Sequence, residues 1–184
     1  MAEYYLISQL PSLDGISDNS PLPVTEERFR ELCRQFLNKK ACNELEKLSL
    51  IPPKAEEKSS SQLVEKWNES ERNLRLALAK LRAEKMNRQS DTDVQLIPGV
   101  FLQYAREAVE FESPMDAEIY LNRCRLQLLE TLRPMDSFSE EYVFYYAIKL
   151  MIIGRIRKFD SVRGEKAYRN IYDSIMNNDR QEVI

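Results

Sequence analysis

The chain has 184 residues, of which 43% are hydrophobic and 31% are charged, and its formal net charge is −3. This composition is typical of a globular protein with a charged surface and excludes a disordered chain, while the acidic balance weighs against a nucleic-acid binder. Glycine contributes only 4 residues, which weighs against β-hairpins and phosphate-binding loops, because both need residues with positive φ.

The N-terminal part of the chain predicts a short segment, a loop and two helices. Residues 3–10 (EYYLISQL) are apolar, and their pattern fits either one short strand or a short helix. Residues 11–23 are rich in Pro, Ser and Asp and form a loop. Thr25 is a good N-cap for the first helix. The second helix carries Ala41, Leu45 and Leu48, and the proline-containing stretch 49–60 is a linker.

Residues 61–88 are typical of one long helix, with Ser60 or Ser61 near its N-cap. Glu71 and Arg75 lie four residues apart and are expected to pair on its exposed face. A polar break follows at 87–97. The apolar face of the helix consists of Leu63, Trp67, Leu74, Ala77, Leu78 and Leu81.

Four further helices are expected after this break. One begins at Pro98-Gly99, and the next begins at Ser113, an N-cap followed by proline, and ends before Pro134. Residues 138–159 are apolar nearly all round, which predicts a helix at the centre of a bundle. A last helix begins at Asp160-Ser161. One of its faces carries Tyr168, Ile171, Tyr172, Ile175 and Met176.

These elements predict an all-α fold, a multi-helix bundle with a short N-terminal extended or helical segment. Two units are expected, a small lobe over 1–60 and a bundle over 61–184, which can also pack as a single domain. The most apolar stretch, 143–153, contains Lys149 and is too short to span a membrane. No signal peptide is expected at the N-terminus. The scattered cysteines, Cys33, Cys42 and Cys124, are interpreted as reduced core thiols in a cytosolic protein.

Catalytic chemistry is weakly supported. The chain has no histidine, so it lacks the usual general base and the commonest metal ligand. It also has no phosphate-binding or dinucleotide-binding motif. We therefore expect no enzyme, no catalytic residues, no cofactor, no metal and no small-molecule substrate. An enzyme that uses carboxylates and tyrosines is the least favoured alternative.

Two basic groups are candidate contact sites. The first group makes the second half of the long helix basic. It either contacts RNA or an acidic protein surface, or it is a solvated helix face with no binding role. Its members are Arg72, Arg75, Lys80, Arg82, Lys85 and Arg88. The second group, Arg155, Arg157, Lys158 and Arg163, is either an electrostatic partner contact or a set of cations that favour a helix C-terminus.

Both ends of the chain resemble a small bacterial family. The opening EYYLISQLPSLDG contains Tyr4, Tyr5, Leu6, Leu10 and Pro11, and TEERFRELC follows it. These stretches are similar to a Tyr-Tyr-Leu segment that ends in Leu-Pro and to a Glu-rich helix that ends in Leu-Cys. The closing KFDSVRGEKAYRNIYDSI resembles the family's own close. The family is uncharacterised and is encoded in bacterial operons for V-type (A-type-like) ATP synthases, which often lack a recognisable gene for the rotor cap.

The resemblance implies a non-catalytic structural subunit associated with a bacterial V-type ATPase, as a shortened equivalent of the rotor cap between the central stalk and the membrane ring. Its partners would then be ATPase subunits of the stalk, the ring or both. It would be cytoplasmic and held peripherally at the inner membrane through the complex. The five matched N-terminal residues are expected to define the fold rather than to bind a partner. The alternatives are a cytosolic adaptor or assembly factor and, less favoured, an RNA-binding helical protein.

Overall fold

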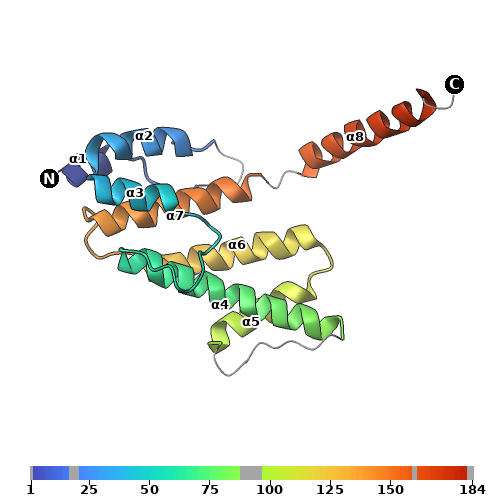
Figure 1. Cartoon of the computed structure of the whole chain (residues 1–184), viewed down its shortest axis with the longest axis horizontal. Coiled ribbons are helices and arrows are strands. Elements are labelled where there is room, and N and C mark those ends of the chain that lie inside the picture. The colour runs from blue at the N-terminus through green and yellow to red at the C-terminus, as the bar shows by residue number, and fades with distance from the viewer. Residues whose placement is uncertain (1, 17–20, 88–96, 159–160, 182–184) are drawn as a thin grey trace.

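A computed structural model describes residues 2–16, 21–87, 97–158 and 161–181, and within α8 it describes the side chains of 164–174. Over these residues the protein has eight α-helices and no strand, which confirms the all-α prediction (Figure 1). The helices are α1 (Ala2–Gln9), α2 (Glu26–Phe36), α3 (Lys39–Lys47), α4 (Gln62–Lys85), α5 (Gly99–Glu110), α6 (Pro114–Thr131), α7 (Glu140–Ile156) and α8 (Ser161–Gln181).

Side-chain caps fix where several helices begin. The hydroxyl of Thr25 accepts a hydrogen bond from the Arg28 amide at 3.2 Å, and Ser61 and Ser113 cap α4 and α6 in the same way. These three caps confirm the sequence predictions. Residues 3–9 of the ambiguous segment are helical, as part of α1, and this helix buries Leu6 completely. The expected polar break at 87–97 lies mostly outside the described residues.

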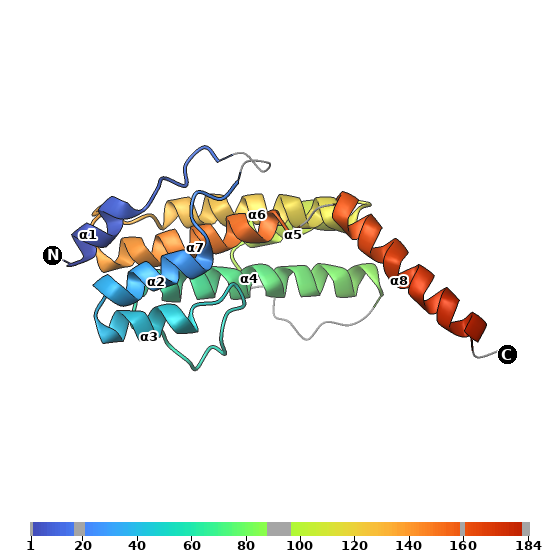
Figure 2. The ribbon, with the colours of Figure 1, turned by 90° about the horizontal axis from the view of Figure 1, so that it is seen from above.

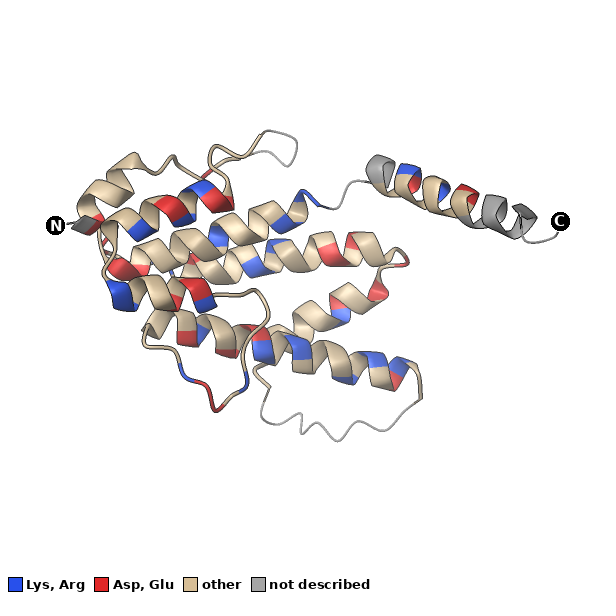
Figure 3. Cartoon of the chain, turned by 45° about the horizontal axis from the view of Figure 1, so that its top comes forward, with Lys and Arg blue, Asp and Glu red and all other residues tan. Residues whose placement is uncertain are grey.

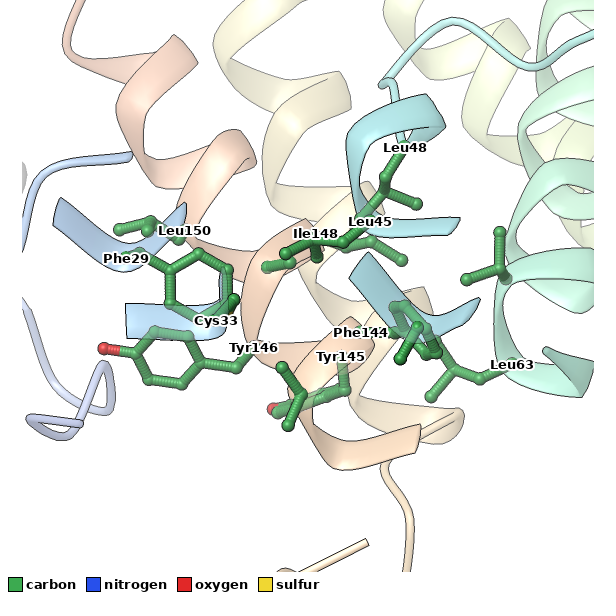
Figure 4. Close-up of a cluster of buried hydrophobic side chains, with 14 of the residues drawn as sticks. Phe29, Cys33, Leu45, Leu48, Leu63, Phe144, Tyr145, Tyr146, Ile148 and Leu150 are labelled. Carbon is green, nitrogen blue, oxygen red and sulfur yellow. The ribbon is translucent and has the colours of Figure 1, made fainter. Parts of the chain in front are cut away.

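Helix α7 lies at the centre of the main core. It contacts α2, α3, α4 and α6, which together cover it on several sides (Figure 2). Figure 4 shows Phe29 beside Tyr146 and Leu63 near Phe144; the Phe29 and Tyr146 rings stack with centroids 5.3 Å apart. The helix predicted to be apolar nearly all round is therefore the buried one, as expected. This core takes residues from both sides of position 60, because α2 and α3 pack on α7.

A second core lies between α4, α5 and α6. Its buried members are Leu74, Ala77, Leu78, Ile97, Phe101, Ala105, Ala108 and Leu121. Helix α4 belongs to both cores, since Trp67 in its first half packs in the main core at 1% exposure. The predicted apolar face of α4 thus joins the main core to the second core. Helices α1 to α7 are together called the body below.

Helix α8 differs from all the other helices. Every side chain described in it, from Gly164 to Ser174, is exposed. In Figures 1 and 2 it extends away from the body. None of the helices in the described parts of the chain is both long and apolar enough to cross a membrane.

Candidate partner-binding surface

The basic cluster near the end of α7 is partly used inside the protein. A guanidinium nitrogen of Arg155 donates to the Glu118 carboxylate on α6, and the Arg155 side chain is only 32% exposed. Arg157 is half-buried and Lys158 is exposed, whereas the side chain of Arg163 lies outside the described part. Of the four residues predicted to contact a partner, Arg155 is therefore already paired with Glu118 inside the protein.

Glu118 belongs to a buried ion network between α4 and α6. Arg125 donates to both carboxylate oxygens of Glu71, from Nε at 2.9 Å and from Nη2 at 3.0 Å, and to Glu118 at 3.2 Å. Arg75 donates to Glu71 at 2.9 Å. Burial disfavours the charged form of Arg125, but the hydrogen bonds and charge of Glu71 outweigh it, and the pKa of Arg125 is raised.

This network corrects the expectation that Glu71 lies on an exposed face, because only 2% of Glu71 is accessible. Arg75 does pair with Glu71, but the side of α4 that carries Glu71 is turned toward α6. A buried carboxylate needs compensating charge, and Arg125 supplies it from another helix. The network therefore joins helices and offers no charge to a substrate.

The basic half of α4 is also largely engaged within the chain. Figure 3 shows Lys and Arg gathered there. Arg72 pairs with Glu65 and donates to the Pro53 carbonyl, and Lys85 donates to the Val109 carbonyl at 3.0 Å. Lys80 lies 3.5 Å from Glu84, and Arg88 falls outside the described residues. Arg72 thus holds the 49–60 linker, Lys85 holds the end of α5 and Lys80 pairs within α4, whereas Arg82 is exposed.

A second charged cluster surrounds Lys149 of α7. Its Nζ lies 2.5 Å from Asp14 Oδ1, 2.6 Å from Glu130 Oε1 and 3.2 Å from the Tyr145 hydroxyl. Burial works against the charge of Lys149, but the bonds to Asp14 and Glu130 prevail, and its pKa is raised. Burial and the Glu130 bond raise the pKa of Tyr145 to about 12. A cavity of about 290 Å³ adjoins this cluster.

The contacts of this cluster join different parts of the fold. A lysine that stays protonated is not a nucleophile, and a tyrosine with a raised pKa keeps its proton. The Lys149–Asp14 contact instead ties the loop after α1 to α7. Burial also raises the pKa of the Cys33 thiol to about 12, so this cysteine is unreactive. Among the described residues, no group of three possible metal ligands comes together.

The five N-terminal residues that carry the family resemblance divide into two sets. Leu6 is fully buried, and Leu10 and Pro11 are half-buried, with the Pro11 carbonyl accepting a hydrogen bond from the Tyr146 hydroxyl at 2.8 Å. Tyr4 and Tyr5 are exposed, and the Tyr4 ring stacks on Phe138. Leu6, Leu10 and Pro11 thus hold α1 and its loop against the rest of the body, whereas the two tyrosines lie at the surface.

The apolar face of α8 is the surface that stands out. Tyr168, Ile171 and Tyr172 are 68%, 60% and 52% exposed, and they lie on one side of the helix because they are spaced three and four residues apart. The two tyrosine rings stack with centroids 6.3 Å apart. We call these three residues the α8 stripe. The sequence shows the stripe, but only the structure shows that the helices of the body, over the residues it describes, leave these three side chains exposed.

Comparison of the chain with protein-family models, with curated proteins and with solved structures gives no match.

Proposed function

We propose that this protein is a non-catalytic helical subunit that holds a partner protein through α8, as part of a bacterial V-type ATP synthase or ATPase. The observation that carries the binding role is the exposed α8 stripe on a helix that the body does not cover. Exposed apolar residues grouped on one face mark an interaction site more often than single exposed ones do.

The stripe has the spacing of a helix that is recognised in a groove. Such helices present anchors at i, i+3, i+4 and i+7, and Tyr168, Ile171 and Tyr172 occupy the first three of these positions. The sequence places Ile175 at the fourth. Tyrosine is also enriched among the residues that contribute most to binding.

The ATPase assignment is supported by the resemblance at both ends of the chain, and the second of these ends includes α8. The body suits a structural subunit, because it has two buried apolar cores and its buried charges are paired. A cytosolic adaptor or assembly factor would use the same surface. RNA binding is disfavoured, because most described cations of α4 are held in internal contacts.

The test is affinity purification of the tagged full chain from its native host at moderate salt, followed by mass spectrometry. We expect ATPase head and central-stalk subunits to co-purify in fixed ratio, and to be lost with Ile171→Asp. Lys166→Asp is the matched control, since it puts the same acid on the charged side of α8 and should retain the partners. If the wild type recovers no ATPase subunit, the assignment is wrong; equal recovery with Ile171→Asp would mean that another surface binds.

A further inference from the structure

A cavity lies between the end of α3, the 49–60 linker and the first half of α4. Its volume is about 560 Å³, and pockets that hold small ligands commonly measure about 300–1,000 Å³. None of the residues of the α8 stripe lines it. We call it the linker cavity. Its inner part carries the buried side chains of Leu48, Val64 and Asn68, and its rim carries the exposed side chains of Lys47, Glu57 and Lys58.

The walls of the linker cavity are held by hydrogen bonds. The Pro53 carbonyl accepts a hydrogen bond from the Arg72 guanidinium of α4 at 3.3 Å, and the Ser59 amide donates to the Glu65 carboxylate at 3.0 Å. The Ser59 hydroxyl donates to the Glu44 carboxylate of α3. Because these bonds tie the linker to both helices, the cavity is preformed by the fold, as ligand sites usually are.

Asn68 is the side chain that sets this cavity apart. It is only 4% exposed, yet its side-chain amide forms no hydrogen bond with any described residue. Every other buried polar side chain in the described parts of the chain has an internal partner. These residues are Ser61, Glu71, Asn122, Arg125 and Lys149. A buried polar group that lacks a partner destabilises a fold, so an amide at position 68 is explained if it binds a molecule that enters the cavity.

The inner part of the cavity has the chemistry that recognises a peptide bond. The side-chain carbonyl of asparagine accepts a hydrogen bond and its NH₂ group donates, so Asn68 can pair with the N–H and the C=O of one main chain at the same time. Leu48 and Val64 line the same cavity with apolar groups. They provide a contact for an apolar side chain next to the bound amide, as in other ligand sites.

The charges around the cavity balance each other. Lys47 and Lys58 oppose Glu44 and Glu57, and Glu44 already accepts hydrogen bonds from two serine hydroxyls. Over the described residues, neither lysine forms an ion pair, and nor does Glu57. A nucleotide or another polyanion therefore meets no net positive charge here. A short peptide, which has an ammonium group at one end and a carboxylate at the other, matches both signs.

We propose that the linker cavity binds a short peptide. Asn68 pairs with a main-chain amide, Leu48 and Val64 contact an apolar side chain, and the charged rim faces the ends of the peptide. A free peptide and the carboxyl end of a protein chain share this chemistry. The site lies apart from the α8 stripe in its residues, so its failure and the failure of the proposed function are independent.

The test is affinity selection with the purified full chain. The protein is incubated with a library of tripeptides that have free ends, with the same library acetylated at the N-terminus, and with a mixture of free amino acids. The molecules retained on ultrafiltration are identified by mass spectrometry. We expect tripeptides with an apolar residue to be retained. We expect free amino acids to pass through, because they contain no peptide bond for Asn68 to pair with.

Asn68→Leu is the decisive variant, because leucine has the same branched shape but no amide. Retention of tripeptides should fall at least about tenfold, whereas the urea midpoint of unfolding should stay the same or rise, since no internal hydrogen bond is lost. Asn73→Leu is the matched control. It makes the same change on the same helix at a residue that does not line the cavity, and it should retain the tripeptides within about twofold.

The two libraries distinguish the sources of the peptide. Equal retention of the acetylated library would assign the site to the carboxyl end of a protein chain, and retention of the free-ended library alone would assign it to a free peptide. The proposal is overturned if the wild type retains neither library, if free amino acids are retained in place of tripeptides, or if Asn68→Leu retains as much as the wild type. A lower urea midpoint for Asn68→Leu would also overturn it, by showing that the amide has an internal role.

Discussion

Helices α7 and α8 contain the same pair of residues in opposite surroundings. In α7, Tyr145 and Ile148 are three residues apart and are 2% and 0% exposed. In α8, Tyr168 and Ile171 have the same spacing and are 68% and 60% exposed. Local sequence makes both segments helical, but neighbouring helices decide which of them is covered. The contrast therefore separates residues that stabilise the body from residues that remain available to a partner.

The sharpest test of this contrast substitutes the matched isoleucines. Ile148→Ala should reduce the free energy of unfolding by about 2–5 kcal/mol, because it leaves a cavity in the main core. Ile171→Ala should change it by less than about 0.5 kcal/mol, as at an exposed site. Urea denaturation of the purified variants measures both. Similar losses at the two positions would show that α8 packs on the body after all.

The second prediction compares two arginines that pair with glutamate. Arg125→Met removes the buried partner of Glu71 and should cost about 3 kcal/mol, the lower end for a broken buried pair because Arg75 remains. Arg169→Met breaks the exposed Arg169–Glu165 pair of α8 and should cost less than about 0.5 kcal/mol. The same urea measurement applies. A small effect at Arg125 would mean that Arg75 alone compensates the charge of Glu71.

The third prediction concerns Lys149 and pH. Lys149→Met should cost about 1–2 kcal/mol at pH 7, a modest value because Asp14 and Glu130 are 58% and 42% exposed. The hydrogen bond from Lys149 lowers the pKa of Asp14. Burial raises the pKa of Glu130, but the hydrogen bonds from Lys149 and Tyr145 and the charge of Lys149 together outweigh it, and the pKa is lowered. The ionised carboxylates therefore stabilise the folded protein at pH values above their pKa in the unfolded chain, which is about 4. This stabilisation is lost as the pH falls through their pKa values in the folded protein.

The measurement is urea unfolding of the wild type and Lys149→Met between pH 7 and pH 3. The difference between the two proteins should begin to narrow below about pH 4, because the carboxylates then take up protons in the unfolded chain more readily than beside Lys149 in the folded wild type. A difference that stays constant over this range would show that Lys149 acts through packing of its alkyl chain alone.

The smallest effect is expected from removal of α8. A chain that ends at residue 158 should unfold with a free energy within about 0.5 kcal/mol of the full chain, because the described side chains of α8 lie exposed. It should also lose the partner that the full chain recovers. A large loss of stability would place α8 among the elements that hold the body together.

Most of the fold could be predicted from the sequence because its signals are local. Thr25, Ser61 and Ser113 begin helices through hydrogen bonds to amides three residues away. The apolar surface of α7 likewise indicated its central place. Residues 3–10 are ambiguous in sequence because so short a segment shows no clear hydrophobic period. In the structure residues 3–9 of the segment are helical and Leu6 is buried.

The arrangement of charges could not be predicted in the same way. Glu71 was expected on an exposed face because Arg75 is four residues away, yet its second partner, Arg125, lies 54 residues further along the chain. The basic cluster near residue 155 was likewise noted without Glu118, which lies 37 residues earlier. The α8 stripe was recognisable by its spacing, but whether other helices cover it depends on the tertiary structure.

The order of elements along the chain has a consequence for biosynthesis. Because α8 follows α1 to α7, the ribosome completes all the segments of both cores before it makes α8, and domains generally fold as units from the N-terminal side. The body can therefore fold without competition from the exposed tyrosines of α8. A nascent chain that stalls or is cleaved before Ser161 would yield a folded body without this helix, and under the proposed function such a product would not bind the partner.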